Sequence, residues 1–446
     1  MRIKLFFFLL IFCQSAFADN KIKVINWQEE ISLTNQGKSG IITIEMQVVN
    51  LAKNYLINSY QIASSSKNIR YSQVEIDGSL VDFQQNSGVL NIKFNQPKKN
   101  FDNFKISYRY DEIYPQVQNY LRQEAIYVPD FAGNANYKII FNYDQKYDLL
   151  TIHNNAQKVK NENGFSLTFQ GVASQTGYLE KIRLTSSSAK WQAIVRNIIS
   201  LENTNGTLEA KTPILFRDGP QLVEKQDLTS TLNSIDRGTD KKNIFFKFKT
   251  TPEVSKIIIE NKAIVITGKK NQNIFQHNPL NYQEFSSDEE LAVSSLVNQA
   301  KNNSQYQNLP LYAKLTMFVH DFIKYDYSLY GKEPNLEEIV NNKIGVCSEY
   351  ARLLNAMARV AKIPAITING LAINEKNKFE AHAWNALFVD GGWIFVDPTW
   401  GLSSGNVSSS HIFLRSQGSK DIELKFIGNK DANFSADFEF EVNSIE

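Results

Sequence analysis

Cysteine is nearly absent from this sequence, which holds only Cys13 and Cys347 in 446 residues. Cys13 lies in an apolar N-terminal run that is expected to be removed, so a single thiol remains. One thiol can form neither an intrachain disulfide nor a cysteine-rich zinc site. No two histidines stand at the spacing of a metal-binding motif either, so we expect no metal and no other cofactor.

An excess of one charge is also missing. The chain has 48 basic and 46 acidic residues, and removal of residues 1–18 takes away Arg2 and Lys4, which leaves 46 of each. A formally neutral chain offers no electrostatic attraction to nucleic acid or to an anionic membrane surface. Glycine and proline are few, at 21 and 11 residues, which excludes a collagen-like or proline-rich chain.

Long apolar runs are limited to the N-terminus, where the sequence predicts an export signal over residues 1–18. A basic start and the apolar residues 5–13 precede Ala16-Phe17-Ala18, which fits the small-x-small cleavage rule. An uncleaved membrane anchor is the less favoured alternative, because the run is short for a bilayer span. We therefore expect a secreted or periplasmic protein with no stable membrane insertion after signal cleavage.

Aromatic residues are plentiful, at 12% of the chain, and with the many β-branched residues they favour strands. Apolar and polar side chains alternate most regularly over residues 104–110. This pattern predicts a β-sandwich-like domain over residues 19–112 and a second β-rich domain over residues 113–285. One or two further strands are expected in residues 416–446.

The pattern becomes helical near residue 286. Residues 287–290 contain the serine and acids of a capping box, which predicts a helix through about residue 302. Pro310 is expected in the first turn of the next helix, which carries an apolar stripe.

Three of the five histidines are expected to carry no chemistry. His153 and His277 stand alone in polar segments and are expected to be exposed to solvent. His320 lies off the apolar stripe of its helix and is expected at the surface.

Cys347 stands where a buried helix is expected to begin. Apolar residues recur at helical spacing from Leu353 to Val360, and Gly345 permits a tight turn into the helix. The helix dipole and the free N–H groups at such a position stabilise a thiolate and can hold a developing oxyanion. Cys347 is therefore a candidate nucleophile, with a small buried hydrophobe as the structural alternative.

A predicted β-hairpin over residues 381–397 supplies a base and an acid. If Asp390-Gly391 is its turn, His382 and Asp397 are diagonal neighbours on one face, with Cα atoms roughly 7–8 Å apart. If Gly391-Gly392 is the turn, the two still share a face. Either register predicts a His382 base oriented by Asp397, and with Cys347 they complete a nucleophile, base and acid.

Several short segments resemble the core of the transglutaminase-like superfamily, and the resemblance covers residues 286–415. They are Gly345-Val346-Cys347, Ala361-Lys362-Ile363-Pro364-Ala365, Gly370, His382-Ala383-Trp384 and Trp393-Ile394-Phe395-Val396-Asp397-Pro398-Thr399. The resemblance implies a papain-like thiol fold. It departs from the family pattern at Lys362, where the family often has glycine.

The resemblance also implies roles for individual residues. Cys347 would be the nucleophile, His382 the base and Asp397 the orienting acid. The family usually has a further oxyanion donor upstream of the cysteine, and the candidates here are Tyr325, Tyr327 and Tyr330.

The expected fold is therefore a multidomain α+β protein, with β-sandwich-like domains before an α+β papain-like core over residues 286–415. The favoured function is an exported thiol acyl-transfer enzyme that acts on carboxamide or peptide bonds of proteins or peptides. Hydrolysis is favoured over cross-linking, since nothing marks an amine site. The alternative is an inactive scaffold in a binding or envelope-assembly protein. The sequence leaves the substrate and the oligomeric state open.

Overall fold

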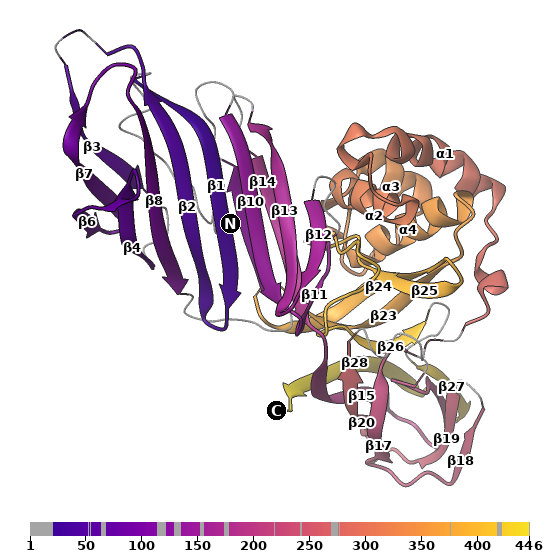
Figure 1. Ribbon diagram of the computed structural model, residues 1–446. Coiled ribbons are helices and arrows are strands. Elements are labelled where there is room, and N and C mark those ends of the chain that lie inside the picture. The colour runs from indigo at the N-terminus through magenta and orange to yellow at the C-terminus, as the bar shows by residue number, and fades with distance from the viewer. Residues whose placement is uncertain are drawn as a thin grey trace. The chain divides into compact units, whose positions relative to one another are not determined.

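Strands dominate the fold, and helices gather in one segment of the chain (Figure 1). The protein is described from a computed structural model, in which the predicted export signal and His153 lie outside the described residues. The predicted multidomain α+β fold is confirmed only in its coarse part: the described chain is mostly β, with several sheets and few helices. The structure describes residues 21–445 except 52, 54, 64–67, 114–121, 129–134, 152–155, 174–177, 218, 241–242, 269–274, 276, 375 and 417–421.

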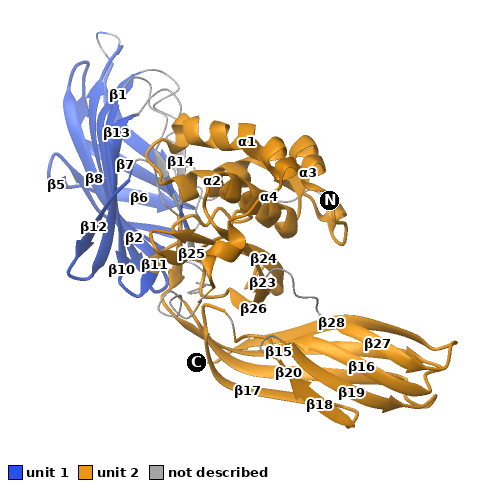
Figure 2. Ribbon diagram, turned by 90° about the vertical axis from the view of Figure 1, so that its right-hand side faces the viewer, with its two compact units in different colours: residues 1–147, 153–183 blue, residues 148–152, 184–446 orange. Residues whose placement is uncertain are grey.

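The chain divides into two compact units, residues 1–147 with 153–183 and residues 148–152 with 184–446 (Figure 2). The first unit is built on an eight-stranded sheet of order β12-β13-β10-β1-β2-β8-β4-β5, and β3, β7 and β6 form a second sheet. Its strands are β1 (Ile22–Thr34), β2 (Gly37–Val48), β3 (Ile57–Ala63), β4 (Ile69–Ile76), β5 (Ser79–Leu80), β6 (Phe83–Asn86), β7 (Val89–Lys98), β8 (Asn103–Ile113), β9 (Arg122–Val128), β10 (Ala135–Asp144), β12 (Ala156–Asn161) and β13 (Gly164–Ala173).

The eight-stranded sheet runs across residue 112, where the sequence analysis places a domain boundary. β1 pairs in parallel with β10, with Trp27 opposite Tyr137, so residues on both sides of that boundary share one sheet. Period-two alternation does appear in β8 as predicted, and Phe104, Ile106 and Tyr108 are buried. Alternation shows which face of a strand is buried but not which distant strand pairs with it, so the boundary differs.

The second unit begins with two four-stranded sheets, β17-β20-β15-β28 and β18-β19-β16-β27. Two strands contain residues assigned to both units: β11 (Tyr147–Leu149) and β14 (Tyr178–Ser186). The strands predicted after residue 416 are present, and they join these sheets, with Phe440 opposite Val195. The strands are β15 (Ala189–Glu202), β16 (Gly206–Pro213), β17 (Leu222–Ser230), β18 (Asp236–Thr239), β19 (Asn243–Thr250), β20 (Lys256–Thr267), β27 (Glu423–Gly428) and β28 (Asn433–Ser444).

The segment from residue 279 to 416 holds four α-helices, three short 3-10 helices, the two-stranded sheet β21-β22 and a four-stranded sheet of order β25-β24-β23-β26 among its described residues. None of the helices among the described residues is both long and apolar enough for a membrane span. The elements are η2 (Pro279–Tyr282), α1 (Ser287–Asn302), η3 (Ser304–Tyr306), α2 (Leu311–Phe322), β21 (Lys324–Tyr325), η4 (Tyr327–Leu329), α3 (Leu336–Asn342), β22 (Ile344–Gly345), α4 (Cys347–Val360), β23 (Ala365–Ile373), β24 (Phe379–Val389), β25 (Gly392–Val396) and β26 (Ile412–Ser416).

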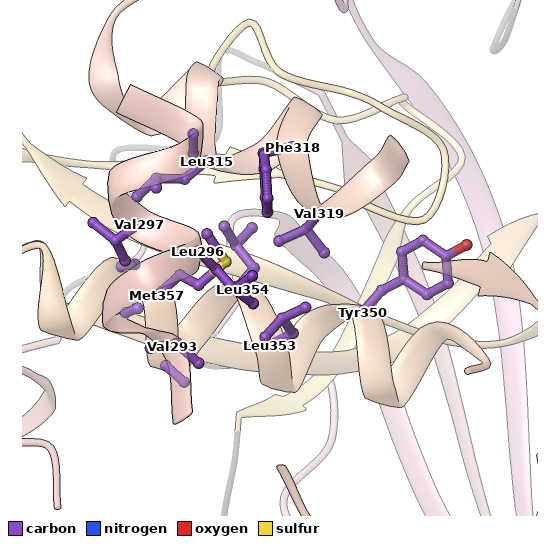
Figure 3. Close-up of a cluster of buried hydrophobic side chains, with 14 of the residues drawn as sticks. Val293, Leu296, Val297, Leu315, Phe318, Val319, Tyr350, Leu353, Leu354 and Met357 are labelled. Atoms are coloured by element: carbon purple, nitrogen blue, oxygen red, sulfur yellow. The ribbon is translucent and has the colours of Figure 1, made fainter. Parts of the chain in front are cut away.

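Helices α1, α2 and α4 form where the sequence predicts them, with the starts of α1 and α2 shifted by one residue, whereas α3 was not predicted. Ser286, not Ser287, caps α1 and forms the capping box with Glu289, while Pro310 lies at the cap of α2 and not inside its first turn. The apolar faces of α1, α2 and α4 meet in one cluster that includes Leu296, Phe318 and Leu354 (Figure 3). Each such side chain contributes about 1.5–3 kcal/mol on burial, which fixes α4 and its first residue in place.

Candidate active site

Cys347 is the first residue of α4, as predicted, and its side chain is partly buried. The helix start is held from within, because the buried Glu349 carboxylate accepts the Val346 N–H at 2.8 Å and the Ser348 hydroxyl at 2.9 Å. Gly345 makes room for this arrangement, since a Cβ at that position would lie 2.5 Å from the Cβ of Glu349. The Cys347 thiol thus lies at the positive end of a fixed helix dipole.

Buried amides join α4 to the strand that carries His382. The Asn385 side chain, in β24, donates to the Ala351 carbonyl at 2.9 Å and to the Asn355 side-chain oxygen at 2.8 Å. Asn355 in turn donates to the Thr367 hydroxyl in β23 at 2.6 Å. These bonds fix the distance between the helix with the thiol and the sheet with the imidazole.

The hairpin adopts the first of the two predicted registers. Val389 pairs with Gly392, so Asp390 and Gly391 form the turn, with φ angles of 51° and 83°. Positive φ at both central residues is the type I′ geometry that suits a two-residue hairpin. Asp397 follows directly after β25, on the side predicted for it.

His382 and Asp397 form a buried pair, with 2.8 Å between His382 Nε2 and Asp397 Oδ2. The other carboxylate oxygen accepts the backbone N–H groups of Thr399 at 2.9 Å and Trp400 at 3.3 Å. Burial opposes the negative charge, but the charge and hydrogen bond of His382 hold the pKa of Asp397 well below its usual range. Asp397 is therefore a carboxylate at neutral pH.

Cys347 completes the group, because His382 also forms a hydrogen bond with its side chain. Burial alone would lower the pKa of His382, but the Asp397 carboxylate and the Cys347 side chain raise it to about 10. Since Nε2 of His382 faces Asp397, Nδ1 is the nitrogen left for the thiol. The structure thus brings all three predicted site residues together, in an arrangement that suits an imidazolium between a thiolate and a carboxylate.

A fourth side chain, His411, was missed by the sequence analysis. It is buried, and its Nε2 lies 3.3 Å from Asp397 Oδ2 while its Nδ1 lies 2.7 Å from the Ser408 hydroxyl oxygen. The only signal in the sequence is a histidine directly before the apolar run of β26, after a serine-rich loop without periodicity. The side-chain atoms of His382, Asp397 and His411 that could ligate a metal lie within 4.8 Å of one another. The hydrogen bonds from the two histidines to Asp397 explain why these atoms are so close.

Two of the histidines predicted to be exposed are packed instead. The His320 ring lies with its Nδ1 3.0 Å from the Pro398 carbonyl oxygen, so this face of α2 covers the segment after Asp397. His277 stacks on Phe275, with ring centroids 4.3 Å apart, and its Nδ1 lies 3.1 Å from the Tyr282 hydroxyl. Both predictions were wrong because helix periodicity and local polarity do not show contacts with segments far along the chain.

The three tyrosines proposed for the oxyanion differ in exposure. Tyr327 and Tyr330 are 65% and 73% exposed. Tyr325 is partly buried and interacts electrostatically with Cys347. Burial first, and Cys347 second, raise the pKa of Tyr325, so its hydroxyl keeps its proton and remains a hydrogen-bond donor. Its backbone pairs with Gly345, two residues before the thiol.

Comparison with known proteins locates the resemblance in the same segment. Residues 287–398 match the model of the transglutaminase-like superfamily. The kyphoscoliosis peptidases of Mus musculus and Homo sapiens are 37% and 36% identical over 71 and 62 residues, which are 14% and 12% of this chain. These matches span 11% and 9% of the relatives, so the chain covers about a tenth of their length.

A solved structure of a proposed cysteine protease from Cytophaga hutchinsonii is also similar, with 15% identity and a TM-score of 0.38. The match covers 58% of this chain and 92% of that one. The residues that match the model of the transglutaminase-like superfamily, 287–398, include Cys347, His382 and Asp397, in agreement with the sequence motifs.

Proposed function

We propose that the protein is a thiol acyl-transfer enzyme that acts on carboxamide or peptide bonds of proteins or peptides, built on a papain-like α+β core. The observation that carries the proposal is the buried His382–Asp397 pair in hydrogen-bond contact with Cys347 at the start of α4. In this proposal Cys347 is the nucleophile, His382 the general base and acid, and Asp397 the group that orients His382.

The reaction would run in two halves. The Cys347 thiolate adds to the substrate carbonyl carbon, and the bond to the leaving nitrogen breaks as His382 Nδ1–H gives its proton to that nitrogen. This leaves a thioester on Cys347 and a neutral imidazole. Water, or an amine, then gives a proton to His382 as it attacks the thioester carbonyl, and the thiolate–imidazolium pair is restored.

Two donors are proposed for the oxyanion of the tetrahedral intermediate. One is the backbone N–H of Cys347, the first residue of α4, a position where an N–H has no partner within the helix. The other is the Tyr325 hydroxyl, because it is protonated and interacts with Cys347. Tyr327 and Tyr330 are less suited, since water would screen donors so exposed.

Hydrolysis is proposed over cross-linking. The relatives identified by sequence are named peptidases. A second candidate function is an inactive scaffold in a binding or envelope-assembly protein. It draws on the large sheets of both units, which lie outside the matched residues 287–398 and offer extensive strand surface.

The proposed place of action is outside the cytoplasm. The support is the sequence of residues 1–18 alone, with its basic start, apolar run and Ala16-Phe17-Ala18. Mass analysis of exported protein should give a mature N-terminus at Asp19, and a retained Met1 would contradict the proposal.

The test of the enzyme proposal uses iodoacetamide, with the tryptic peptide that contains Cys347 followed by mass spectrometry. Alkylation of the wild-type thiol at pH 5.5 should be far faster than that of a free thiol, whose pKa is about 8.5. His382→Ala should lose this advantage. Release of ammonia or of cleaved peptide from a peptide mixture should then depend on Cys347, with Cys347→Ala as the control. A reactive thiol without any such release would favour the scaffold.

A further inference from the structure

The Asp397 carboxylate is shared between two histidines. Oδ2 receives both His382 Nε2 at 2.8 Å and His411 Nε2 at 3.3 Å, while Oδ1 receives two backbone N–H groups. A carboxylate offers about four lone-pair positions, so this set of four donors saturates it. Its plane is therefore fixed by contacts on every side, and the proposed function uses only one of the four.

The tautomer of His411 follows from its partners. Asp397 is a carboxylate and can only accept, so His411 Nε2 carries a proton and donates it. His411 Nδ1 then accepts from the Ser408 hydroxyl at 2.7 Å, and Ser408 accepts from the Ser410 hydroxyl at 2.8 Å. A single chain of donors thus runs from Ser410 through Ser408 and His411 to Asp397.

The His411 ring is held in this position by its surroundings. The ring packs edge-on against Trp384 and Trp400, at centroid-to-centroid distances of 4.9 and 5.2 Å. The backbone N–H of His411 donates to the Ser408 carbonyl at 3.0 Å. Burial, and then the nearby His382 charge, lower the pKa of His411 against the opposing effects of Asp397 and the Ser408 backbone, so the ring is neutral at neutral pH. It gives Asp397 a hydrogen bond without adding a second cation.

We propose that His411 is a positioning residue for the thiol reaction: its Nε2–H fixes the Asp397 carboxylate in the orientation that holds His382 toward Cys347. The inference rests on the proposed function, because it assigns a role within that site. Without this donor, Oδ2 could turn away from His382, and the imidazole would lose the bond that sets its tautomer.

The matched test is His411→Gln against His411→Met. The two side chains have nearly the same length, but only the amide of glutamine can donate to Asp397. The readout is the rate of Cys347 alkylation by iodoacetamide at pH 5.5 on folded full-length protein. His411→Met should lower the rate about tenfold to a hundredfold, the range for a hydrogen bond to a charged group. His411→Gln should stay within about threefold of wild type.

A double-mutant cycle shows whether His411 acts through Asp397. In an Asp397→Asn background, His411→Met should cost no further alkylation rate, since the group it positions is already lost. An equal loss for His411→Gln and His411→Met, or a full additional loss in the Asp397→Asn background, would overturn the inference.

The controls separate this inference from the proposed function. If wild-type Cys347 reacts no faster than in His382→Ala, the proposed function itself fails. If wild type is fast and His411→Met equals it, only the inference fails. Should His411→Met not fold, Ser408→Ala replaces it and should lower the rate about threefold to tenfold by freeing the other tautomer. An unchanged rate in that variant would then overturn the inference.

Discussion

The indole of Trp400 lies parallel to the imidazole of His382, with ring centroids 4.2 Å apart and an interplanar angle of 8°. An aromatic face attracts a cation, so this contact favours the charged form of His382. It also covers one face of the ring that bonds to Asp397, and keeps water from competing for that bond. Trp400 follows Asp397-Pro398-Thr399 in sequence, so one segment provides both the carboxylate that bonds to His382 and the indole that packs on it.

Replacement of Trp400 with leucine should therefore lower the pKa of His382 from its value of about 10. Leucine keeps the site apolar but removes the aromatic face, and a loss of about 0.5–2 kcal/mol corresponds to roughly one pKa unit. The measurement is the alkaline limb of the Cys347 alkylation rate against pH. Trp400→Phe is the control and should shift it less. A limb that does not move in Trp400→Leu would rule out this role.

The stability of the second unit should depend on pH through the His382–Asp397 pair. His382 has a raised pKa, so its contribution is complete below its unfolded value of about 6.5 and is lost as the pH rises through about 10. Asp397 has a lowered pKa, so its contribution is present above about 3.9 and is lost as the pH falls. The pair therefore stabilises most between about pH 4 and 6.5.

Thermal unfolding of wild type and of His382→Gln measures this effect. Glutamine does not titrate, so the difference in Tm between the two proteins should shrink from pH 6 to pH 10. A difference that stays constant over this range would show that the pair is not charged as described.

Much of the site could be predicted from the sequence because its signals are local. The start of α4 at Cys347, the turn at Asp390-Gly391 and the shared face of His382 and Asp397 all follow from periodicity and turn chemistry over a few residues. Hydrogen bonds between neighbouring elements then bring the groups together.

The parts that were missed depend on contacts between distant segments. His411 reaches Asp397 from a loop with no periodic pattern, and His320 reaches Pro398 across 78 residues. The sequences of β1 and β10 likewise contain no local signal that these two strands pair in parallel. A local pattern reports burial, but it does not name the partner.

Replacement of Asp397 with asparagine should lower both activity and stability. The sequence alone suggests that folding would survive, because the position lies near a hairpin end. In the structure Asp397 is fully buried, and an amide NH₂ at Oδ2 would face the N–H donors of His382 and His411. An unsatisfied buried donor costs about 1–3 kcal/mol, and the triad loss is about 10⁴ in turnover for this swap in a serine triad.

Urea unfolding and turnover on the same Asp397→Asn preparation check this prediction. A folded protein with near wild-type turnover would remove Asp397 from the mechanism. A stable protein with turnover reduced by several orders of magnitude would instead show that the two histidines rearrange around the amide.

Lys362 should be a site where glycine stabilises the fold. Lys362 directly follows the C-cap residue of α4 and has a φ angle of 65°. Its N–H donates to the Arg359 carbonyl at 2.8 Å, and the N–H of Ile363 donates to the Ala358 carbonyl. This left-handed closure of a helix favours glycine, and a side chain there costs about 1–2 kcal/mol. The greater freedom of glycine in the unfolded chain offsets part of this gain.

We therefore expect Lys362→Gly to raise the free energy of unfolding by about 0.5–1 kcal/mol, measured from the urea midpoint at an unchanged m-value. Lys362→Ala is the matched control: it removes the exposed amine but keeps the Cβ in the same strained backbone, so it should leave stability close to wild type. Equal gains in both variants would assign the effect to the lysine side chain and not to its φ angle. Lys362 lies at the opposite end of α4 from Cys347, so Lys362→Gly should leave the alkylation rate of that thiol unchanged.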